Sequence, residues 1–331
     1  MNTKTLLILG IVLILVSCSK QKTQNPVVSH KLVFSELASV WDEAIPLGNG
    51  MVGNLVWQKE GKLRFSLDRA DLWDLRPMGN IDFDKWKFKD VYEHWKTDKY
   101  QEVQKAFDVP YDQSPAPSKI PAGALEFDIS KLGKIKQVSL DVETAVCTVA
   151  WENGTKLTTF VHGENPVGWY KFENLPETIK IELIAPAYNR ESSGERADQS
   201  TGDLNQLGYP QGEIIKEENS FTYNQKGWGD FAYQIHTEWK NNGSELVGCW
   251  SVSSENKGWE PSPKATENVV AAENQEYENS LKKHLGWWQN YWSQSSISIP
   301  DSLLEKQYYL EMYKFGSAAR ADAPPISLQA V

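Results

Sequence analysis

The chain has 331 residues, of which 34 are basic and 44 are acidic, so its formal net charge at pH 7 is −10. This acidic balance argues against nucleic acid as a partner, because binding to phosphates needs a basic surface. Hydrophobic residues make up 40% of the chain and charged residues 24%, which indicates a folded globular protein rather than a disordered one. The length suffices for one large domain or two ordinary ones.

The N-terminus has the pattern of a bacterial secretory signal. Leu6–Val16 is an uninterrupted apolar run that is too short to cross about 30 Å of hydrocarbon, so it indicates a signal peptide. The run ends at Ser17-Cys18, which resembles the lipobox of bacterial lipoproteins. We expect residues 1–17 to be the signal, Cys18 to carry the lipid and residues 18–28 to form a tether. The alternative is an ordinary signal peptide with a chance cysteine.

This pattern also predicts a location. An exported chain with a lipid at Cys18 would be anchored to the bacterial envelope, either on the periplasmic face of the outer membrane or at the cell surface. The membrane would then be a partner through the N-terminal lipid alone.

Residues 29–262 are predicted to form a large antiparallel β-sandwich. Asn153-Gly154 lies between two β-rich runs, which is a strong hairpin signal because both turn positions need positive φ. Many strands at short spacing with turn residues between them are typical of a sandwich. The expected strands are Val142–Trp151, Lys156–His162, Val167–Phe172, Ile179–Ile184, Ile214–Tyr223, Phe231–Trp239 and Glu245–Ser253.

Three stretches interrupt the strand pattern. Lys85–Phe107 is charged and aromatic, so we expect a helical excursion there. Pro110–Pro121 is rich in proline and serine and is predicted to be a loop. Tyr188–Pro210 is a long polar stretch with few apolar residues, and a loop of that length is usually functional or mobile.

The pattern becomes helical after residue 262. Ala265–Trp292 has apolar residues at helical spacing, so residues 263–300 are predicted to be a helical linker. Asp301 or Ser302 can cap a further helix that carries a broad apolar surface and ends at Pro324-Pro325.

Two motifs frame the chain. The first is Trp41–Gly53, followed by Leu67–Trp73. The second comprises Trp287–Trp292, Ser317–Arg320 and Pro325–Gln329. Their order and spacing resemble the N-terminal part of the α-L-fucosidases of glycoside hydrolase family 95 and the related family 65 N-terminal domains, within the six-hairpin glycosidase clan.

The resemblance implies a mainly β fold: a large sandwich, a helical linker and, over residues 301–331, the start of an (α/α)6 catalytic barrel. It also implies an inverting exo-glycosidase acting on plant or host glycans, whose acid and base lie about 6.5–9.5 Å apart. The family's catalytic groups all lie in the barrel, so we expect none before Val331. The implied partners are an oligosaccharide or polysaccharide and the missing barrel in cis, with no cofactor. Asp68-Arg69 stands where the family has Asn-Glu, which leaves the sugar open.

A second function remains open at this point. The chain could be a stand-alone, lipid-anchored glycan-binding lipoprotein without catalysis. However, a binding module has no reason to carry a barrel-entry helix with an exposed apolar side, which is an aggregation liability without its partners. The sequence therefore favours the scaffold portion of an enzyme.

Three residues are candidates for contact with a sugar: Asn49, Trp73 and Gln329. Asn49 lies in Gly48-Asn49-Gly50, which predicts a tight turn, so a structural role is the main expectation. Trp73 is one of 14 tryptophans, and packing in the core explains such residues better than sugar stacking. Gln329 heads toward the missing barrel and could line the complete active site.

The remaining polar residues are predicted to be structural. Asp68, Asp71 and Asp74 recur every three residues, but without a calcium-loop pattern they favour turn, cap and ion-pair roles over calcium. No CxxC or HExxH spacing is present, so no metal is expected. Structural roles are predicted for three histidines, and burial as free thiols is favoured over a disulfide for two cysteines: His162, His236, His284, Cys147 and Cys249.

Overall fold

The computed structural model describes residues 30–325, apart from 80–81, 83, 85–86, 114–116, 189–203 and 257–261. The predicted signal and tether, Cys18 and Gln329 therefore lie outside the described residues. Within this part of the chain, no helix is both long and apolar enough to cross a membrane.

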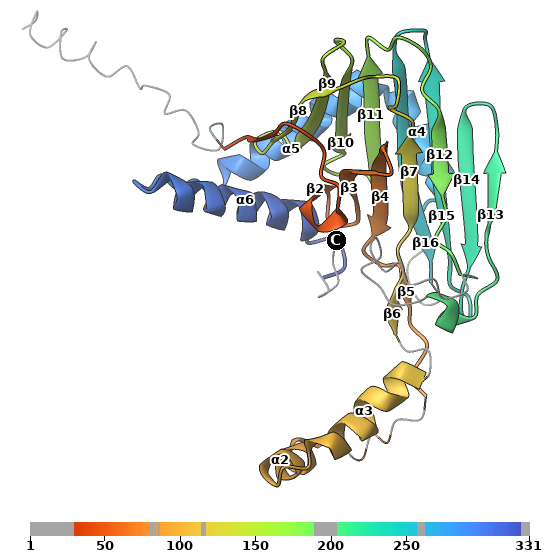
Figure 1. Ribbon diagram of the computed structural model, residues 1–331, viewed down its shortest axis with the longest axis vertical. Coiled ribbons are helices and arrows are strands. Elements are labelled where there is room, and N and C mark those ends of the chain that lie inside the picture. Colours follow the sequence, from red (N-terminus) through yellow and green to blue (C-terminus); the bar gives the residue numbers. More distant parts are fainter. Residues whose placement is uncertain are drawn as a thin grey trace, which may run out of the picture.

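The fold is mainly β and is built on two antiparallel sheets that pack face to face (Figure 1). The nine-stranded sheet contains, in spatial order, β1 (Leu32–Phe34), β8 (Ile135–Asp141), β9 (Val146–Trp151), β10 (Lys156–Val161), β11 (Val167–Glu173), β16 (Leu246–Glu255), β15 (Ala232–Asn241), β14 (Ser220–Lys226) and β13 (Glu213–Lys216). The five-stranded sheet contains β12 (Ile181–Ile184), β7 (Gly123–Phe127), β4 (Lys62–Arg69), β3 (Val52–Lys59) and β2 (Ile45–Gly48). The predicted antiparallel sandwich is confirmed.

Aromatic rings fill the space between the sheets. Phe65 of β4 and Phe127 of β7 come from the smaller sheet, with ring centroids 5.0 Å apart. Tyr170 of β11 comes from the larger sheet, and its ring centroid lies 5.1 Å from that of Phe127. All three side chains are fully buried, and each such burial stabilises the fold by about 2–3 kcal/mol. The core therefore belongs to both sheets together.

Two strand predictions need correction. The run Ile214–Tyr223 is not one strand but two, β13 and β14, because the backbone turns back and the amide of Glu217 donates to the carbonyl of Ser220. The strand expected from Val142 begins only at Val146, because Ala145 has a φ of 53° and ends a turn.

A pair of helices packs on the outer face of the nine-stranded sheet, away from the smaller sheet (Figure 1). They are α4 (Ala265–Gln275) and α5 (Tyr277–Ser293), where the sequence predicted one continuous helix. The break falls at Glu276, whose φ of 64° no helix accommodates. The kink lets Val269 of α4 and Tyr277 of α5 both pack on Trp169 of the sheet.

The last helix, α6 (Ser302–Ala318), begins where the sequence predicted it. The Asp301 carboxylate accepts hydrogen bonds from the amides of Leu303 and Leu304 at 3.0 and 3.2 Å, so Asp301 is its N-cap. The helix ends six residues before Pro324, because Ala319 is already extended. Other short elements are the 3-10 helices η2 (Trp41–Glu43) and η4 (Leu204–Leu207).

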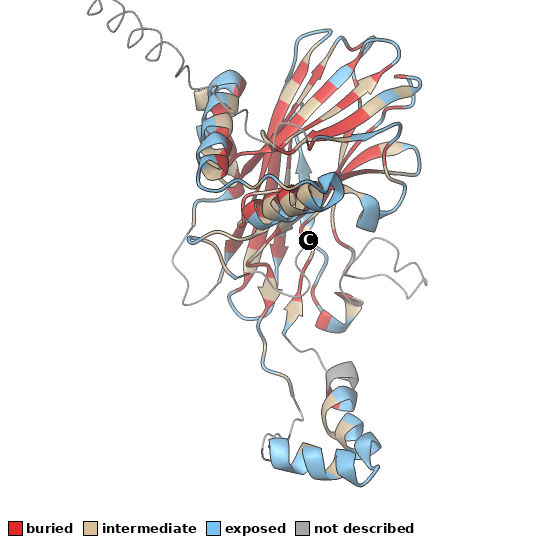
Figure 2. Cartoon of the chain, turned by 90° about the vertical axis from the view of Figure 1, so that its left-hand side faces the viewer, coloured by how far each residue is buried: buried red, intermediate tan, exposed pale blue. Residues whose placement is uncertain are grey.

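A helical arm projects from the lower end of the sandwich. It consists of α2 (Phe88–Lys96) and α3 (Tyr100–Gln113), and it is rooted in the small ribbon of β5 (Trp73–Asp74) and β6 (Ser118–Lys119) (Figures 1 and 2). The predicted helical excursion is confirmed. The loop predicted from Pro110 is wrong at both ends, because α3 continues to Gln113 and β6 begins at Ser118. Pro110 lies inside α3, where it removes one donor from the hydrogen-bond ladder of the helix.

Candidate functional site

The two sequence motifs meet in space, at a place that we call the junction. The turn Gly48–Gly50 between β2 and β3 lies against the C-terminal end of α6, where the amide of Gly50 donates to the carbonyl of Ser317 at 2.7 Å. A Cβ on Gly48 would come within 2.7 Å of that same carbonyl oxygen. Gly50 has a φ of +81°, and a Cβ there would lie 2.5 Å from Cγ of Arg320. Only glycine allows this approach.

Asn49 fixes the turn to the neighbouring strands. Its Oδ1 accepts from the amides of Met51 and Val52, at 3.1 and 2.9 Å. Its Nδ2 donates to the carbonyls of His162 and Asn165, at 2.9 and 2.8 Å. The side chain is 6% exposed, so its polar atoms are occupied by the chain itself. The predicted tight turn is confirmed, and contact with a sugar stays a prediction.

His162 orders the turn between β10 and β11. Its Nδ1 accepts hydrogen bonds from the amides of Glu164 and Asn165, at 3.1 and 3.0 Å. Burial lowers the pKa of His162 to about 4, which keeps the ring neutral and Nδ1 free to accept. The carbonyls that Asn49 needs are thereby held in place, and the structural role predicted for His162 is confirmed.

Arg320 locks the end of α6 onto this turn. Its Nη1 donates to the carbonyl of Gly163 at 3.0 Å, and its Nε donates to the carbonyl of Gly316 at 2.6 Å. The guanidinium lies 3.4 Å from the ring centroid of Trp287 in α5, a cation–π contact. Burial lowers the pKa of Arg320 to about 10. The sequence placed Arg320 in a motif but gave it no role, because Gly163 is 157 residues away.

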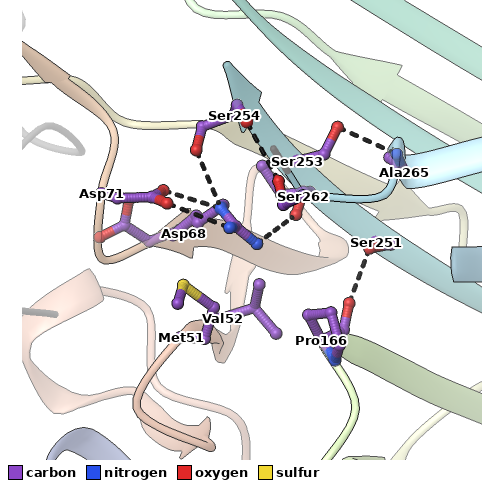
Figure 3. A network of polar contacts seen from close by, with 12 residues as sticks. Met51, Val52, Asp68, Asp71, Pro166, Ser251, Ser253, Ser254, Ser262 and Ala265 are labelled. Atoms are coloured by element: carbon purple, nitrogen blue, oxygen red, sulfur yellow. Dashed lines mark hydrogen bonds and ion pairs between the residues drawn. The ribbon is translucent and has the colours of Figure 1, made fainter. Parts of the chain in front are cut away.

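A second arginine joins the two sheets beside the junction. Figure 3 labels two of its partners, Asp71 and Ser254. Arg69 of β4 forms a two-pronged ion pair with Asp71, at 2.7 and 3.0 Å. It also donates to the carbonyl of Val252 and the hydroxyl of Ser254 in β16. Arg69 is 4% exposed, so this pair is desolvated and depends on these hydrogen bonds.

The aspartates that recur every three residues are all engaged by cations. Asp71 pairs with Arg69 as described. Asp74 pairs with Arg76, and Asp68 pairs with Lys119. Burial raises the pKa of Asp68, although Lys119 favours its charged form. The ion-pair roles that the sequence favoured for these aspartates are therefore confirmed. No three side chains of metal-ligating type gather anywhere in the described part of the chain.

Two hollows flank the junction. One, of about 410 Å³, is mixed in character and is lined by Arg320, Glu164, Asp322, Asn268 and Trp287, among others. The other, of about 220 Å³, is largely apolar and lies between the Gly48–Gly53 hairpin, Lys119, the end of α6 and the last described residues, Pro324 and Pro325.

The other residues that the sequence singled out are a tryptophan, two histidines and two cysteines. Trp73 is half-buried in β5, at the root of the helical arm, where it pairs with Lys119 of β6. Its role as a sugar platform stays a prediction. Nδ1 of His236 bonds to the hydroxyl of Thr222, and His284 bonds to the carbonyl of Thr144. Both are structural, and Cys147 and Cys249 are buried free thiols, as predicted.

Most polar groups of the junction are satisfied by the chain, although Nε2 of His162 and Nη2 of Arg320 are buried without a hydrogen-bond partner among the described residues. The amide of Asn49, the guanidinium of Arg69 and the ring of His162 bind backbone or neighbouring side chains. These contacts hold the C-terminal end of α6 against the sandwich. The fold and the junction thus define a class: a β-sandwich scaffold domain followed by docked helices.

The family is shown by sequence. Residues 32–246 match the family described as glycosyl hydrolase family 65, N-terminal domain, and the chain belongs to this family. Among solved structures, a protein described as "Putative kojibiose phosphorylase from human microbiome" is similar, with a TM-score of 0.53 and 10% sequence identity. That likeness covers 87% of this chain and 39% of the other, and at this identity it concerns the fold. No curated protein matches the chain.

Proposed function

We propose that the chain is the N-terminal scaffold portion of an exported, lipid-anchored glycoside hydrolase, and that residues 301–331 begin its helical catalytic barrel, the rest of which follows. The observation that supports the proposal most directly is that one side of α6 packs on the sandwich while its other side is exposed. Its bare side exposes Leu303, Leu304 and Phe315, which are 73%, 59% and 59% exposed. A side of this kind is expected of a helix whose other neighbours belong to a following domain.

The docked side of α6 is held by two buried tyrosines that both stack and form hydrogen bonds. The Tyr309 ring stacks on His30, and its hydroxyl donates to the carbonyl of Ile297 at 2.7 Å. The Tyr313 ring stacks on Trp288, and its hydroxyl donates to the carbonyl of Pro46 at 2.6 Å. Because these rings are fully buried, α6 has a fixed orientation on the sandwich. A following barrel would therefore start from a defined position.

The chemistry proposed for the parent enzyme is inverting cleavage of a glycosidic bond, with an α-L-fucosidase-like exo-glycosidase as the first candidate. The motifs Trp41–Gly53 and Trp287–Gln329 support it. The acid and base would lie beyond Val331, so we propose that this chain alone is inactive. A phosphorylase, in which phosphate replaces the attacking water, is the second candidate, because the structural neighbour is described as one.

The proposed location rests on Ser17-Cys18 at the end of the apolar run. If Cys18 carries a lipid, the change Cys18→Ala should move the protein from the membrane fraction to the soluble fraction. Membrane association that persists in the variant would contradict the anchor and leave the scaffold role untouched.

The activity is tested by comparing two polypeptides. One is this chain, and the other is the product of the natural reading frame read beyond Val331. Both are assayed on aryl α-L-fucoside and a panel of aryl glycosides, with and without inorganic phosphate. We expect turnover only in the longer product. Turnover by this chain alone that a point mutation within it abolishes would contradict the proposal. A natural stop codon after Val331, with measurable glycan affinity, would establish the stand-alone binding lipoprotein instead.

A further inference from the structure

The helical arm carries an exposed row of apolar side chains. Phe88, Val91, Tyr92 and Trp95 follow one another at positions i, i+3, i+4 and i+7 of α2, so they share one face of that helix. Phe88 is 82%, Tyr92 41% and Trp95 62% exposed, and α2 buries none of its residues. This spacing is the one by which an amphipathic helix inserts its apolar face into a groove on another protein surface.

The root of the arm is held by buried polar contacts. Asp74 of β5 is completely buried, and its carboxylate accepts from the guanidinium of Arg76 and from the hydroxyl of Tyr209, at 2.8 and 2.6 Å. On the facing strand β6, Lys119 is 5% exposed and donates to Asp68 and to the carbonyl of Arg69. Both strands of the root are thus tied into the sandwich.

The geometry of the rings disfavours a sugar as the occupant. The rings of Phe88 and Tyr92 stack with centroids 5.7 Å apart and planes 18° apart, and the ring of Trp95 lies 5.7 Å beyond Tyr92. Neighbouring rings therefore cover part of one another's faces, whereas stacking on a sugar needs open faces. Rings arranged in this way present their edges to a partner, which suits insertion between the side chains of a protein groove.

Charge and position disfavour a lipid surface. Interfacial helices carry a lysine-rich polar face, but α2 combines Lys89 and Lys96 with two acids, Asp90 and Glu93. The start of the described chain is also distant, since His30 packs on Tyr309 of α6. Figure 1 places α6 beside the middle of the sandwich and the arm below its lower end.

We propose that the aromatic row of α2 docks into an apolar groove of the helical catalytic barrel that follows Pro325, so that the arm clasps that domain from the side opposite α6. The inference rests on the proposed function. Lys119, at the root of the arm, lines the same apolar hollow as Pro324 and Pro325, so the arm begins where the chain leaves the sandwich. In Figure 1, α6 extends to the left of the sandwich and the arm extends below it.

The size of the partner is consistent with this position. The chain accounts for 39% of the similar solved protein, so more than half of that neighbour lies outside the matched fold. A domain of that size, starting at Pro325, would contact the bare side of α6 first and could reach the arm next. Two surfaces with unpartnered apolar residues would then be covered by one body.

The test compares hydrogen exchange in this chain and in the full product of its natural reading frame. The amides of α2 should exchange at least tenfold more slowly in the longer protein. Phe88→Ser combined with Trp95→Ser should abolish that protection and leave the exchange of the sandwich strands unchanged. Lys89→Ser combined with Lys96→Ser has the same seven-residue spacing on another face of α2, and it should keep the protection.

Each alternative outcome overturns a particular statement. Fast exchange of α2 in a longer protein that cleaves glycosides overturns the docking inference and leaves the proposed function standing. A reading frame without a following helical domain overturns both. Protection of α2 in this chain alone that grows with protein concentration, measured together with its mass by light scattering, assigns the row to a second copy. Protection that appears only with added oligosaccharide assigns it to a glycan.

Discussion

The sandwich carries two pairs of helices, and they differ in where their aromatic side chains lie. In α5, Trp288 and Trp292 are buried against the sandwich and α6. In α2, Trp95 is 62% exposed. Both helices are amphipathic, so amphipathicity alone does not tell whether a helix is docked. The difference lies in the opposing surface, which for α5 belongs to the same chain, and the stability of the fold should depend on α5 and not on α2.

Replacing one tryptophan with alanine in each pair of helices should give the largest difference in stability between the two regions. Trp288→Ala removes a fully buried ring that stacks on Tyr313, and it should lower the free energy of unfolding by about 4 kcal/mol. Trp95→Ala should change it by less than about 0.5 kcal/mol, because the ring is exposed. Urea unfolding of both variants measures this. Equal losses would show that the arm is part of the cooperative core.

The junction offers a sharper comparison between two buried asparagines. Asn49→Ala leaves two carbonyls and two amides without their partner, and it should cost about 3 kcal/mol of unfolding free energy. Asn54 of β3 is 2% exposed, but its side chain has no hydrogen-bond partner among the described residues. Asn54→Ala should therefore cost about 1 kcal/mol or less. A reversed order would mean that burial and not hydrogen bonding sets the cost here.

Acid should weaken the docked region before it affects the carboxylates. Burial lowers the pKa of His162 to about 4 and that of His284 to about 3, both below the usual 6.5. Below pH 6.5 the unfolded chain takes up protons that the folded chain does not, so stability is lost as the pH falls from 6.5 toward 4. Each histidine adds a slope of up to about 1.4 kcal/mol per pH unit. His162→Gln should flatten the dependence between pH 6.5 and 5, and an unchanged slope would refute the cause.

Arg320 should have a modest effect on global stability and a local one that is easy to measure. Arg320→Ala removes the bond to the carbonyl of Gly163 and the contact with Trp287, at a cost of about 1–2 kcal/mol. Hydrogen exchange should quicken at the C-terminal end of α6, and the amides of α2 should not change. Arg320→Lys should restore little, because an ammonium does not reproduce the planar contact. Full recovery by lysine would show that charge alone matters.

Local chemistry made the sandwich predictable. Asn153-Gly154 joins β9 and β10 as expected, although only Gly154 has the positive φ that was expected of both, and Asp301 caps α6. Both signals depend on residues adjacent in sequence. The break between α4 and α5 was missed because Glu276 is neither glycine nor proline. It nevertheless adopts a positive φ, and the helices on either side of it contribute Val269 and Tyr277 to the same buried cluster as Trp169. Tertiary contacts overrode local preference there.

The sequence predicted the separate elements of the candidate site, but it did not predict that they lie together in the fold. The sequence identified the turn at Asn49 and the motif that contains Arg320. It could not show that they meet, because the meeting depends on Ser317 approaching Gly50 across 267 residues of chain. The arm was predicted to be helical, but its exposure was not, since burial is decided by neighbours that the sequence does not display.

The contacts of α6 also set an order of events during synthesis. The carbonyl of Pro46 accepts a hydrogen bond from the hydroxyl of Tyr313, which is 267 residues later in the chain. His30 bonds to Glu305, which is 275 residues later. A nascent chain can pair β2 with β3 early, yet the surface on which α6 packs stays open until nearly the whole chain has left the ribosome. Such a surface is exposed to association with other chains during that interval. The sandwich therefore completes its packing late, when α6 arrives, and not strand by strand as it emerges.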